Sequence, residues 1–350
     1  MPTLEWNEKN FELKLLDQRV LPREVKYITC QDYTAVAEAI QSMVVRGAPA
    51  IGVVAAYGMA LAGGRSQKGD LDAVRKELRE AAAVLLAARP TAVNLAWAVE
   101  RMLKTADRPA ASIQDLKERL LNEAHGMARE DVETNRKMAE HGAKLIDDGD
   151  TILHHCNTGA LATVDWGTAL GVIRMAHEQG KRIHVLVDET RPRLQGARLT
   201  AWELSLYGIP YHIISDGAAG YFLHTGQVQK VFFGADRVAS NGDVANKIGS
   251  YMLALAAHDN QVPVYSVFPL STVDLELRNG DAIPIEERSQ EEVLDIQLRG
   301  EPVTPLGAQA RNPAFDVTPH RLLTGLVTEM GVFYPPFEHS LRRAISGKNS

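Results

Sequence analysis

The sequence contains only two cysteines, Cys30 and Cys156, among 350 residues. A secreted fold held together by disulfides is therefore not expected, and a reducing compartment is predicted. Basic residues are too few for a nucleic-acid-binding stripe, since 38 lysines and arginines stand against 44 acidic residues. The first residues, MPTLEWNEKN, have no apolar signal-peptide core. These absences predict a cytoplasmic protein that does not bind nucleic acid.

Long hydrophobic runs are also scarce. The most apolar stretch extends from Ala48 to Gly64, with Arg46 and Arg65 at its flanks. It is short for a membrane-spanning helix and rich in Ala and Gly rather than Leu and Ile. We therefore expect a buried, closely packed helix and no membrane partner.

Several common catalytic and cofactor-binding motifs are missing. No G-x-G-x-x-G run follows a predicted strand, and no G-x-S-x-G nucleophile elbow occurs. Neither C-x-x-C nor H-x-x-x-H is present, so His154 and Cys156 have no further zinc ligands at a suitable spacing. We expect neither a dinucleotide cofactor nor a metal site.

Helical patterns dominate the first 125 residues. Two short strands are expected to precede four helices, and a charged connector, either one long helix or a broken pair, leads to the rest. The strands are 11–16 and 24–30, the helices are 34–45, 48–64, 70–88 and 91–106, and the connector is 113–146. We place the domain boundary near residue 125. Residues 1–125 then form a mainly helical domain with a short β-hairpin, and residues 126–350 form a second domain.

The hydrophobic period changes from Gly149 onward, where strand-like runs alternate with helical segments. The predicted strands are 151–155, 183–187, 211–214, 230–233 and 262–267, and the predicted helices are 166–179, 197–207 and 246–257. This alternation predicts an α/β fold, a Rossmann-like and mostly parallel sheet with helices on both faces. The Pro-, Gly- and charge-rich stretch 271–319 is expected to be an irregular lid, or an arm that packs on a dimer partner.

Two predicted strands end in residues that can carry chemistry. Cys156 follows the first strand, and Gly234-Ala235-Asp236-Arg237 follows the fourth. Ligands of open parallel sheets bind outside the carboxyl ends of the strands, so Cys156 and Asp236 are expected to face one crevice. The alternatives are an inert buried thiol, and an aspartate that caps a turn or pairs with Arg237.

Three basic side chains are candidates for binding an anion. Arg46 and Arg89 lie in the helical region, and Lys247 follows Asn246 at the predicted start of helix 246–257. A helix N-terminus beside a lysine or arginine suits a phosphate group, although a single arginine is more often a solvated surface charge. The run Glu286-Glu287-Arg288 is interpreted as a solvated loop cluster.

Seven segments together resemble one enzyme family, in order and over nearly the whole chain. They are VVRGAPAIG (44–52), ARPTAVNL (88–95), HCNTGALAT (155–163), VDETRPRLQGARLTAWEL (187–204), GADRVASNGDVANKIGSY (234–251), GDAIPIEER (280–288) and NPAFDVTP (312–319). They resemble the methylthioribose-1-phosphate isomerases. Weaker similarity extends to ribose-1,5-bisphosphate isomerase and to the non-enzymatic regulatory subunits of the eukaryotic initiation-factor exchange complex.

This resemblance implies a homodimeric sugar-phosphate isomerase of methionine salvage that needs no metal or organic cofactor. The implied reaction converts 5-methylthioribose 1-phosphate into 5-methylthioribulose 1-phosphate. Cys156 and Asp236 match the family's two catalytic positions. The residues that match its substrate-binding positions are Arg46, Gly47, Ala48, Arg89, Gln195, Asn246 and Lys247.

The chemistry of this substrate suggests a role for each catalytic residue. Phosphate on the anomeric oxygen prevents spontaneous ring opening, so an acid must protonate the ring oxygen. Asp236, held neutral by apolar surroundings, is the candidate acid. Hydrogen must then move from C2 to C1. Either the Cys156 thiolate removes the C2 proton, or a hydride shifts directly beside the thiol, and both routes remain open.

Overall fold

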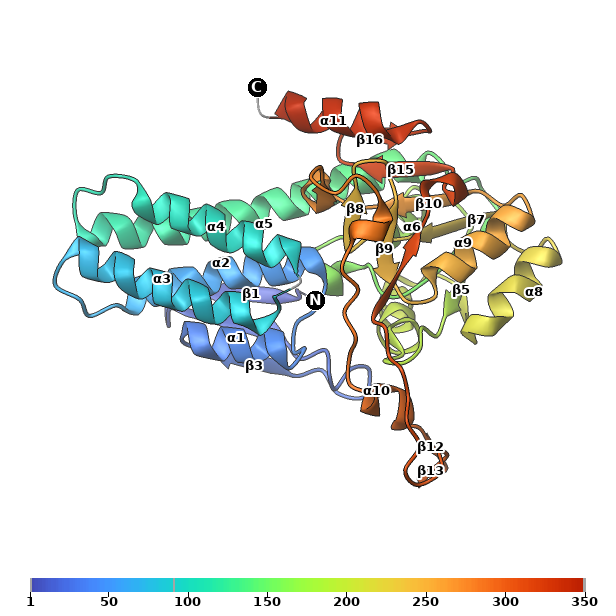
Figure 1. The fold of residues 1–350 in the computed structure, drawn as a ribbon, viewed down its shortest axis with the longest axis horizontal. Coiled ribbons are helices and arrows are strands. Elements are labelled where there is room, and N and C mark those ends of the chain that lie inside the picture. The colour runs from blue at the N-terminus through green and yellow to red at the C-terminus, as the bar shows by residue number, and fades with distance from the viewer. Residues whose placement is uncertain (1, 91, 349–350) are drawn as a thin grey trace. The chain divides into compact units, whose positions relative to one another are not determined.

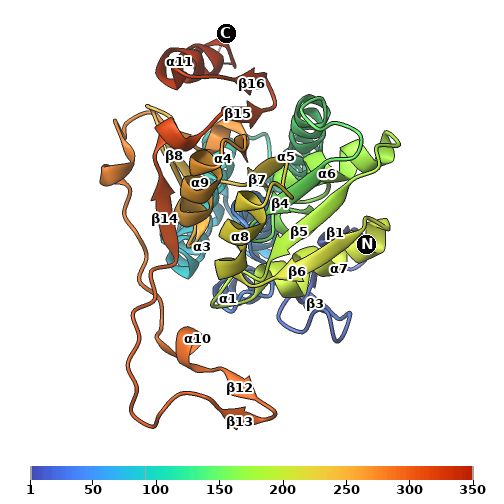
Figure 2. The same ribbon diagram turned by 90° about the vertical axis from the view of Figure 1, so that its right-hand side faces the viewer.

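The computed structural model describes residues 2–90 and 92–348, which fall into two compact units (Figure 1; Figure 2). Unit 1 comprises the residues up to Lys137 together with Thr158–Gly171, and unit 2 comprises the rest. The return of Thr158–Gly171 to unit 1 was not predicted. Both units include part of helix α5 (Ile113–Ala143), so the domain boundary near residue 125 stays a prediction.

Buried hydrogen bonds explain why the segment 158–171 belongs to unit 1. The Thr3 hydroxyl donates to the Ala160 carbonyl oxygen at 2.6 Å, and Gln18 Nε2 donates to the Leu161 carbonyl oxygen at 2.7 Å. Both bonds bridge long sequence separations, which composition and periodicity do not reveal.

Unit 1 begins with a three-stranded antiparallel sheet followed by helices. The strands are β1 (Leu4–Asn7), β2 (Glu12–Leu16) and β3 (Tyr27–Cys30), one more than predicted. The helices are α1 (Tyr33–Gln41), α2 (Ala48–Arg65), α3 (Leu71–Ala88) and α4 (Val93–Asp107), followed by α5. The four predicted helices are confirmed, and of the two alternatives for the connector the structure has one continuous helix. Thr91, in the predicted start of the fourth, lies outside the described residues.

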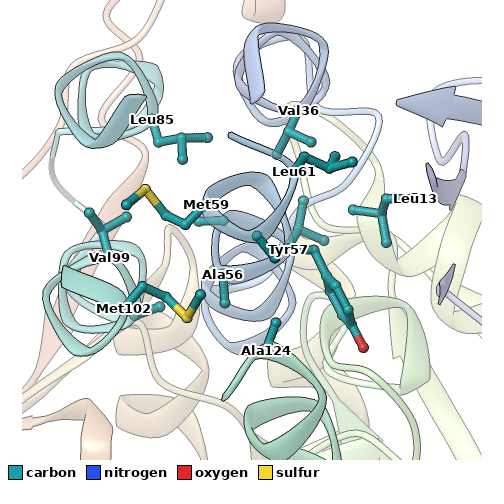
Figure 3. Close-up of a cluster of buried hydrophobic side chains, with 14 of the residues drawn as sticks. Leu13, Val36, Ala56, Tyr57, Met59, Leu61, Leu85, Val99, Met102 and Ala124 are labelled. Carbon is teal, nitrogen blue, oxygen red and sulfur yellow. The ribbon is translucent and has the colours of Figure 1, made fainter. Parts of the chain in front are cut away.

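Helix α2 occupies the centre of the unit 1 core (Figure 3). Every residue from Ala50 to Gly63 is buried. Side chains from the surrounding elements, among them Leu85 of α3 and Met102 of α4, point toward it (Figure 3). Its small residues permit close packing, since a Cβ added to Gly52 would lie 2.9 Å from the Asn94 carbonyl oxygen. The predicted buried helix is confirmed.

No helix in the described part of the chain combines the length and the apolar character needed to cross a membrane.

The central sheet of unit 2 has seven strands in the order β16-β15-β10-β7-β4-β5-β6. These strands are β4 (Thr151–His154), β5 (His184–Asp188), β6 (Tyr211–Ile214), β7 (Lys230–Phe233), β10 (Val264–Val267), β15 (Gly325–Thr328) and β16 (Gly331–Phe333). All neighbours pair in parallel except β15 and β16. Without the antiparallel edge strand β16, this is the Rossmann order 3-2-1-4-5-6. The predicted sheet is confirmed, whereas β15 and β16 were not predicted.

Helices cover both faces of this sheet. Helices α8 (Ala219–His224), α9 (Ser250–Asp259) and α11 (Phe337–Lys348) share one buried cluster with sheet residues such as Leu153 and Phe233. Figure 2 shows α6 (Ala169–Glu178) and α7 (Ala201–Tyr207) on the other face. A π-helical turn (Gly196–Thr200) leads into α7.

A smaller four-stranded sheet corrects one prediction. It consists of β8 (Arg237–Ala239), β9 (Val244–Lys247), β11 (Val273–Asp274) and β14 (Phe315–Thr318). Asn246 and Lys247 therefore lie on strand β9, and the expectation that they open a helix was wrong. All four residues of β9 are buried and pair with β8 and β14, and this pairing outweighs the helix propensity of Ala and Lys.

The stretch 271–319 is also more ordered than predicted. It contains β11, a short helix α10 (Glu291–Leu294), the hairpin of β12 (Gln297–Leu298) and β13 (Glu301–Pro302), and β14.

Candidate active site

Strands β4 and β7 are neighbours in the sheet at the point where the connectivity reverses. Leu153 pairs with Val231 in the parallel register. Cys156 follows the end of β4, and Asp236 follows the end of β7, so both lie at the same carboxyl edge of adjacent strands. Open α/β sheets bind their ligands at such a switch point. The structure thus brings the two predicted catalytic residues to one edge of unit 2.

The backbone of Cys156 is unusual for a residue other than glycine. Its φ is +67°, and the residue is only 8% exposed. The backbone N–H donates to Thr190 Oγ1 at 2.9 Å, and the carbonyl oxygen accepts from Thr200 Oγ1 at 2.7 Å. Non-glycine residues in this region cluster at functional sites, where surrounding contacts maintain the strain.

Asp236 lies in the turn between the two sheets. Its backbone N–H donates to the Ala245 carbonyl oxygen of β9 at 2.9 Å, and the residue is half-buried. The preceding residues, Gly234 and Ala235, are small. The smaller sheet therefore holds the backbone of Asp236 next to the carboxyl end of β7.

Lys247, at the end of β9, interacts through its charge with both Cys156 and Asp236. The residue is 5% exposed, and its Nζ donates to the Ala314 carbonyl oxygen at 2.7 Å. Burial, followed by repulsion from Arg288, lowers the pKa of Lys247 from 10.5 to about 8, while Cys156 and Asp236 act in the opposite direction. A buried cation with a lowered pKa, close to a thiol and a carboxyl group, is typical of a functional site.

Arg288 lies against the same aromatic ring as Lys247 and is a candidate site residue that the sequence interpretation missed. Its side chain is 9% exposed, and its Nε donates to Glu286 Oε1 at 3.0 Å. The Phe315 ring centroid lies 5.6 Å from Arg288 Cζ and 4.8 Å from Lys247 Nζ. The interpretation of this run as a solvated cluster was wrong for Arg288, because two neighbouring glutamates made a buried side chain resemble a surface one.

The amide side chains of Asn246 and Gln195 are both buried. Asn246 Nδ2 donates to the Ser250 hydroxyl at 2.8 Å. Gln195 Oε1 has no hydrogen-bond partner among the described residues, and Gln195 is 6% exposed. A buried carbonyl oxygen without a donor is costly, so this atom fits a ligand that supplies a hydroxyl or an amine.

The remaining predicted binding residues belong to unit 1. Arg46 and Gly47 precede α2, and Ala48 is its first residue, so all three lie at a helix N-terminus suited to an anion. Gly47 has φ +96°, and a Cβ there would lie 2.5 Å from the Ala162 backbone, so only glycine fits. Arg89 follows the last residue of α3.

His155, Asp188 and Asp216 form another polar group in unit 2, with ligand-type atoms within 4.8 Å of one another. His155 Nδ1 pairs with Asp188 Oδ2 and its Nε2 with the Ile248 carbonyl oxygen, both at 2.9 Å. Burial opposes a charge on His155, but the Asp188 carboxylate outweighs it and raises the histidine's pKa. Since both imidazole nitrogens already have acceptors, the group fits a structural network better than a metal site.

Comparison with known proteins extends the resemblance to the whole chain. The protein is 52% identical to methylthioribose-1-phosphate isomerase 2 of Pseudothermotoga lettingae over 341 residues, which covers 97% of each chain. It is 50% identical to methylthioribose-1-phosphate isomerase of Pelotomaculum thermopropionicum over 353 residues, covering 100% of this chain and 95% of the relative.

Solved structures give the same picture. The 5-methylthioribose 1-phosphate isomerase from Pyrococcus horikoshii OT3 superposes with a TM-score of 0.90 at 43% identity, covering 99% of this chain and 96% of the other. A structure described as translation initiation factor eIF-2B, subunit delta, from A. fulgidus gives 0.87 at 44% identity, covering 99% of both. Residues 44–335 match the family model called Initiation factor 2 subunit family, and the chain is a member of that family.

Proposed function

We propose that this protein is a methylthioribose-1-phosphate isomerase that converts 5-methylthioribose 1-phosphate into 5-methylthioribulose 1-phosphate in methionine salvage. The observation that carries the proposal is the juxtaposition of Cys156 and Asp236 at the switch point of the sheet, beside the buried Lys247. It is supported by relatives of that name at about half identity over nearly the full chain.

Asp236 is the proposed general acid. The substrate ring opens when its oxygen is protonated and the bond between that oxygen and C1 breaks, which leaves C1 electron-poor. In this proposal the proton comes from the carboxyl group of Asp236, in the turn that follows β7. The aspartate that remains is the base that can take the proton of the C2 hydroxyl when the ketone forms.

Cys156 acts in the second stage, when hydrogen moves from C2 to C1. In the proton route, the thiolate removes the C2 proton, and the resulting thiol then protonates C1. In the hydride route, the C2 hydrogen migrates with its electron pair, and the thiol stabilises the cationic intermediate. Running the reaction in deuterated water tests for the proton route, because only that route can place solvent deuterium at C1. The absence of deuterium at C1 is compatible with both routes.

The other predicted residues bind the substrate in this proposal. Lys247 and Asn246 interact with phosphate or nearby oxygens, and Gln195 accepts a hydrogen bond from a sugar hydroxyl through its unsatisfied Oε1. Arg46, Gly47, Ala48 and Arg89 are proposed substrate-binding residues on the basis of their motif match. The reaction as written uses no metal or organic cofactor.

Turnover by the purified protein tests this function. Cys156→Ala and Asp236→Asn should each lower kcat by at least about a hundredfold, the loss expected when acid–base participation disappears. Cys30→Ala is the matched control, because Cys30 is a buried thiol of unit 1 that belongs to none of the seven motifs, and the variant should keep its activity. Near-wild-type turnover in Cys156→Ala or Asp236→Asn would reject the role of that residue.

Two neighbouring functions are distinguishable by the same assay. A translation initiation factor subunit, as in the A. fulgidus structure, has no need for turnover, so an inactive wild-type protein would favour that function. Ribose-1,5-bisphosphate run in parallel tests the bisphosphate isomerase. We also propose that the protein is a homodimer and is cytoplasmic. Light scattering after size-exclusion chromatography would test the stoichiometry, and cell fractionation would test the compartment.

A further inference from the structure

A second strained residue lies next to Cys156. Thr190, beyond the end of β5, has φ +63°, a conformation that β-branched residues rarely adopt. Thr190 and Cys156 are joined directly, because the Thr190 hydroxyl accepts the Cys156 backbone N–H at 2.9 Å. Two strained non-glycine residues at adjacent strand ends therefore hold each other in place.

Thr190 is in turn fixed by the neighbouring strand ends. Its hydroxyl donates to the Asp188 carbonyl oxygen at 3.0 Å, and its backbone N–H donates to Asp216 Oδ1 at 2.7 Å. Asp216 follows β6, and its Oδ2 accepts the Arg191 N–H at 2.7 Å. The ends of β4, β5 and β6 are thus linked in sequence by hydrogen bonds, with Cys156 at the end of the series.

Thr200 holds the other side of Cys156. Its hydroxyl donates to the Cys156 carbonyl oxygen at 2.7 Å and accepts from Asn157 Nδ2 at 3.1 Å. The π-helical turn that carries Thr200 approaches β5 closely, since a Cβ added to Gly196 would lie 1.7 Å from the Asp188 carbonyl oxygen. Glycine at that position lets the turn bring Thr200 to the exit of β4.

We propose that Thr190 and Thr200 are positioning residues that set the direction in which the Cys156 thiol projects during isomerisation. Cys156 lies beyond the end of β4, outside the hydrogen-bonding pattern of the sheet. The two threonine hydroxyls bond its backbone N–H and its carbonyl oxygen instead. Without them, Cys156 can relax toward an extended conformation, which turns its side chain away from its present direction. This inference rests on the proposed function for its catalytic readout.

Isosteric substitutions test the inference. Thr190→Val and Thr200→Val keep the branched shape and remove only the hydroxyl. Each should lower kcat by about tenfold to a hundredfold, as expected from a misplaced reacting group, and should leave KM nearly unchanged. Thr190→Ser and Thr200→Ser, which keep the hydroxyl, should restore most of kcat. The matched control is Thr272→Val, because Thr272 is fully buried and its Oγ1 has no hydrogen-bond partner in the described part of the chain.

Alkylation of Cys156 provides a readout that does not require isomerase activity. The rate of iodoacetamide labelling is followed by mass spectrometry of the Cys156 peptide, with the peptide of the buried Cys30 as internal reference. Labelling of Cys156 should be several-fold faster in both valine variants, because the backbone of Cys156 is no longer held in its present conformation. The inference is overturned if kcat and labelling rate in the valine variants equal those of Thr272→Val, or if serine fails to restore them. An inactive wild type would refute the proposed function alone. If one valine variant does not fold, the other tests the opposite backbone group of the same cysteine.

Discussion

Replacing Lys247 by methionine should make stability less dependent on pH. Burial, with repulsion from Arg288, lowers the pKa of Lys247 from 10.5 to about 8. The unfolded chain therefore binds more protons than the folded chain between these two values, and the stability of the wild type rises with pH across this window. By linkage, the lysine destabilises the fold by about 3 kcal/mol at pH 7 and by about 1.5 kcal/mol near pH 9.5.

Urea unfolding of the wild type and Lys247→Met at the two pH values measures this effect. Between about pH 7 and 9.5, the wild type should gain about 2 kcal/mol of unfolding free energy relative to the variant. The difference between wild type and variant cancels the contributions of the other titrating groups. Its change between the two pH values cancels the pH-independent loss of the hydrogen bond from Nζ to the Ala314 carbonyl oxygen. Lys104→Met, whose wild-type lysine side chain is 70% exposed, should behave like the wild type. A relative gain below about 0.5 kcal/mol would refute the argument that burial sets this pKa.

Three further predictions concern packing and substrate binding. Gly47→Ala should lower the unfolding free energy by at least about 2 kcal/mol, because its Cβ would overlap the Ala162 backbone at a positive φ, and thermal denaturation would detect this. Arg288→Gln should raise KM by about tenfold with little change in kcat if the buried cation contacts the substrate phosphate, whereas Arg311→Gln, at an 87% exposed side chain, should change neither. Leu61→Ala should cost about 2–5 kcal/mol of stability in chemical denaturation, because Leu61 is fully buried in α2; a smaller loss would show that the core can collapse around the gap.

The central sheet was predictable because its strands are short apolar runs bounded by small or polar residues. Thr151–His154 and Lys230–Phe233 both have this form, and both precede the residues proposed for catalysis. Once the strands are recognised as parallel, the rule for their carboxyl ends brings Cys156 and Asp236 to one edge without knowledge of any contact. The helices of unit 1 follow similarly from periodicity, and Asp32 and Asp70 cap α1 and α3 as their residue type suggests.

The sequence prediction failed where the position of a residue depends on contacts between distant parts of the chain. Lys247 was assigned to a helix, because its local composition does not reveal the pairing of β9 with β14, about 70 residues later in the chain. Arg288 is buried against Phe315, whereas its sequence neighbours are acidic. Thr190 and Thr200 resemble ordinary loop and helix residues until the tertiary structure brings their hydroxyls to Cys156.

The order of the strands has a practical consequence for protein engineering. The segment between α8 and β7 is exposed at Gly226 and Gln227, and a cut there interrupts no helix or strand. One fragment would carry Cys156 and the other Asp236, so neither would contain both groups. Recovery of turnover on mixing would require β7 to re-form its ladder with β4. Such a divided protein would serve as a complementation reporter whose signal depends on reassembly of the β4–β7 strand pair and of the buried cluster that α8 shares with α9.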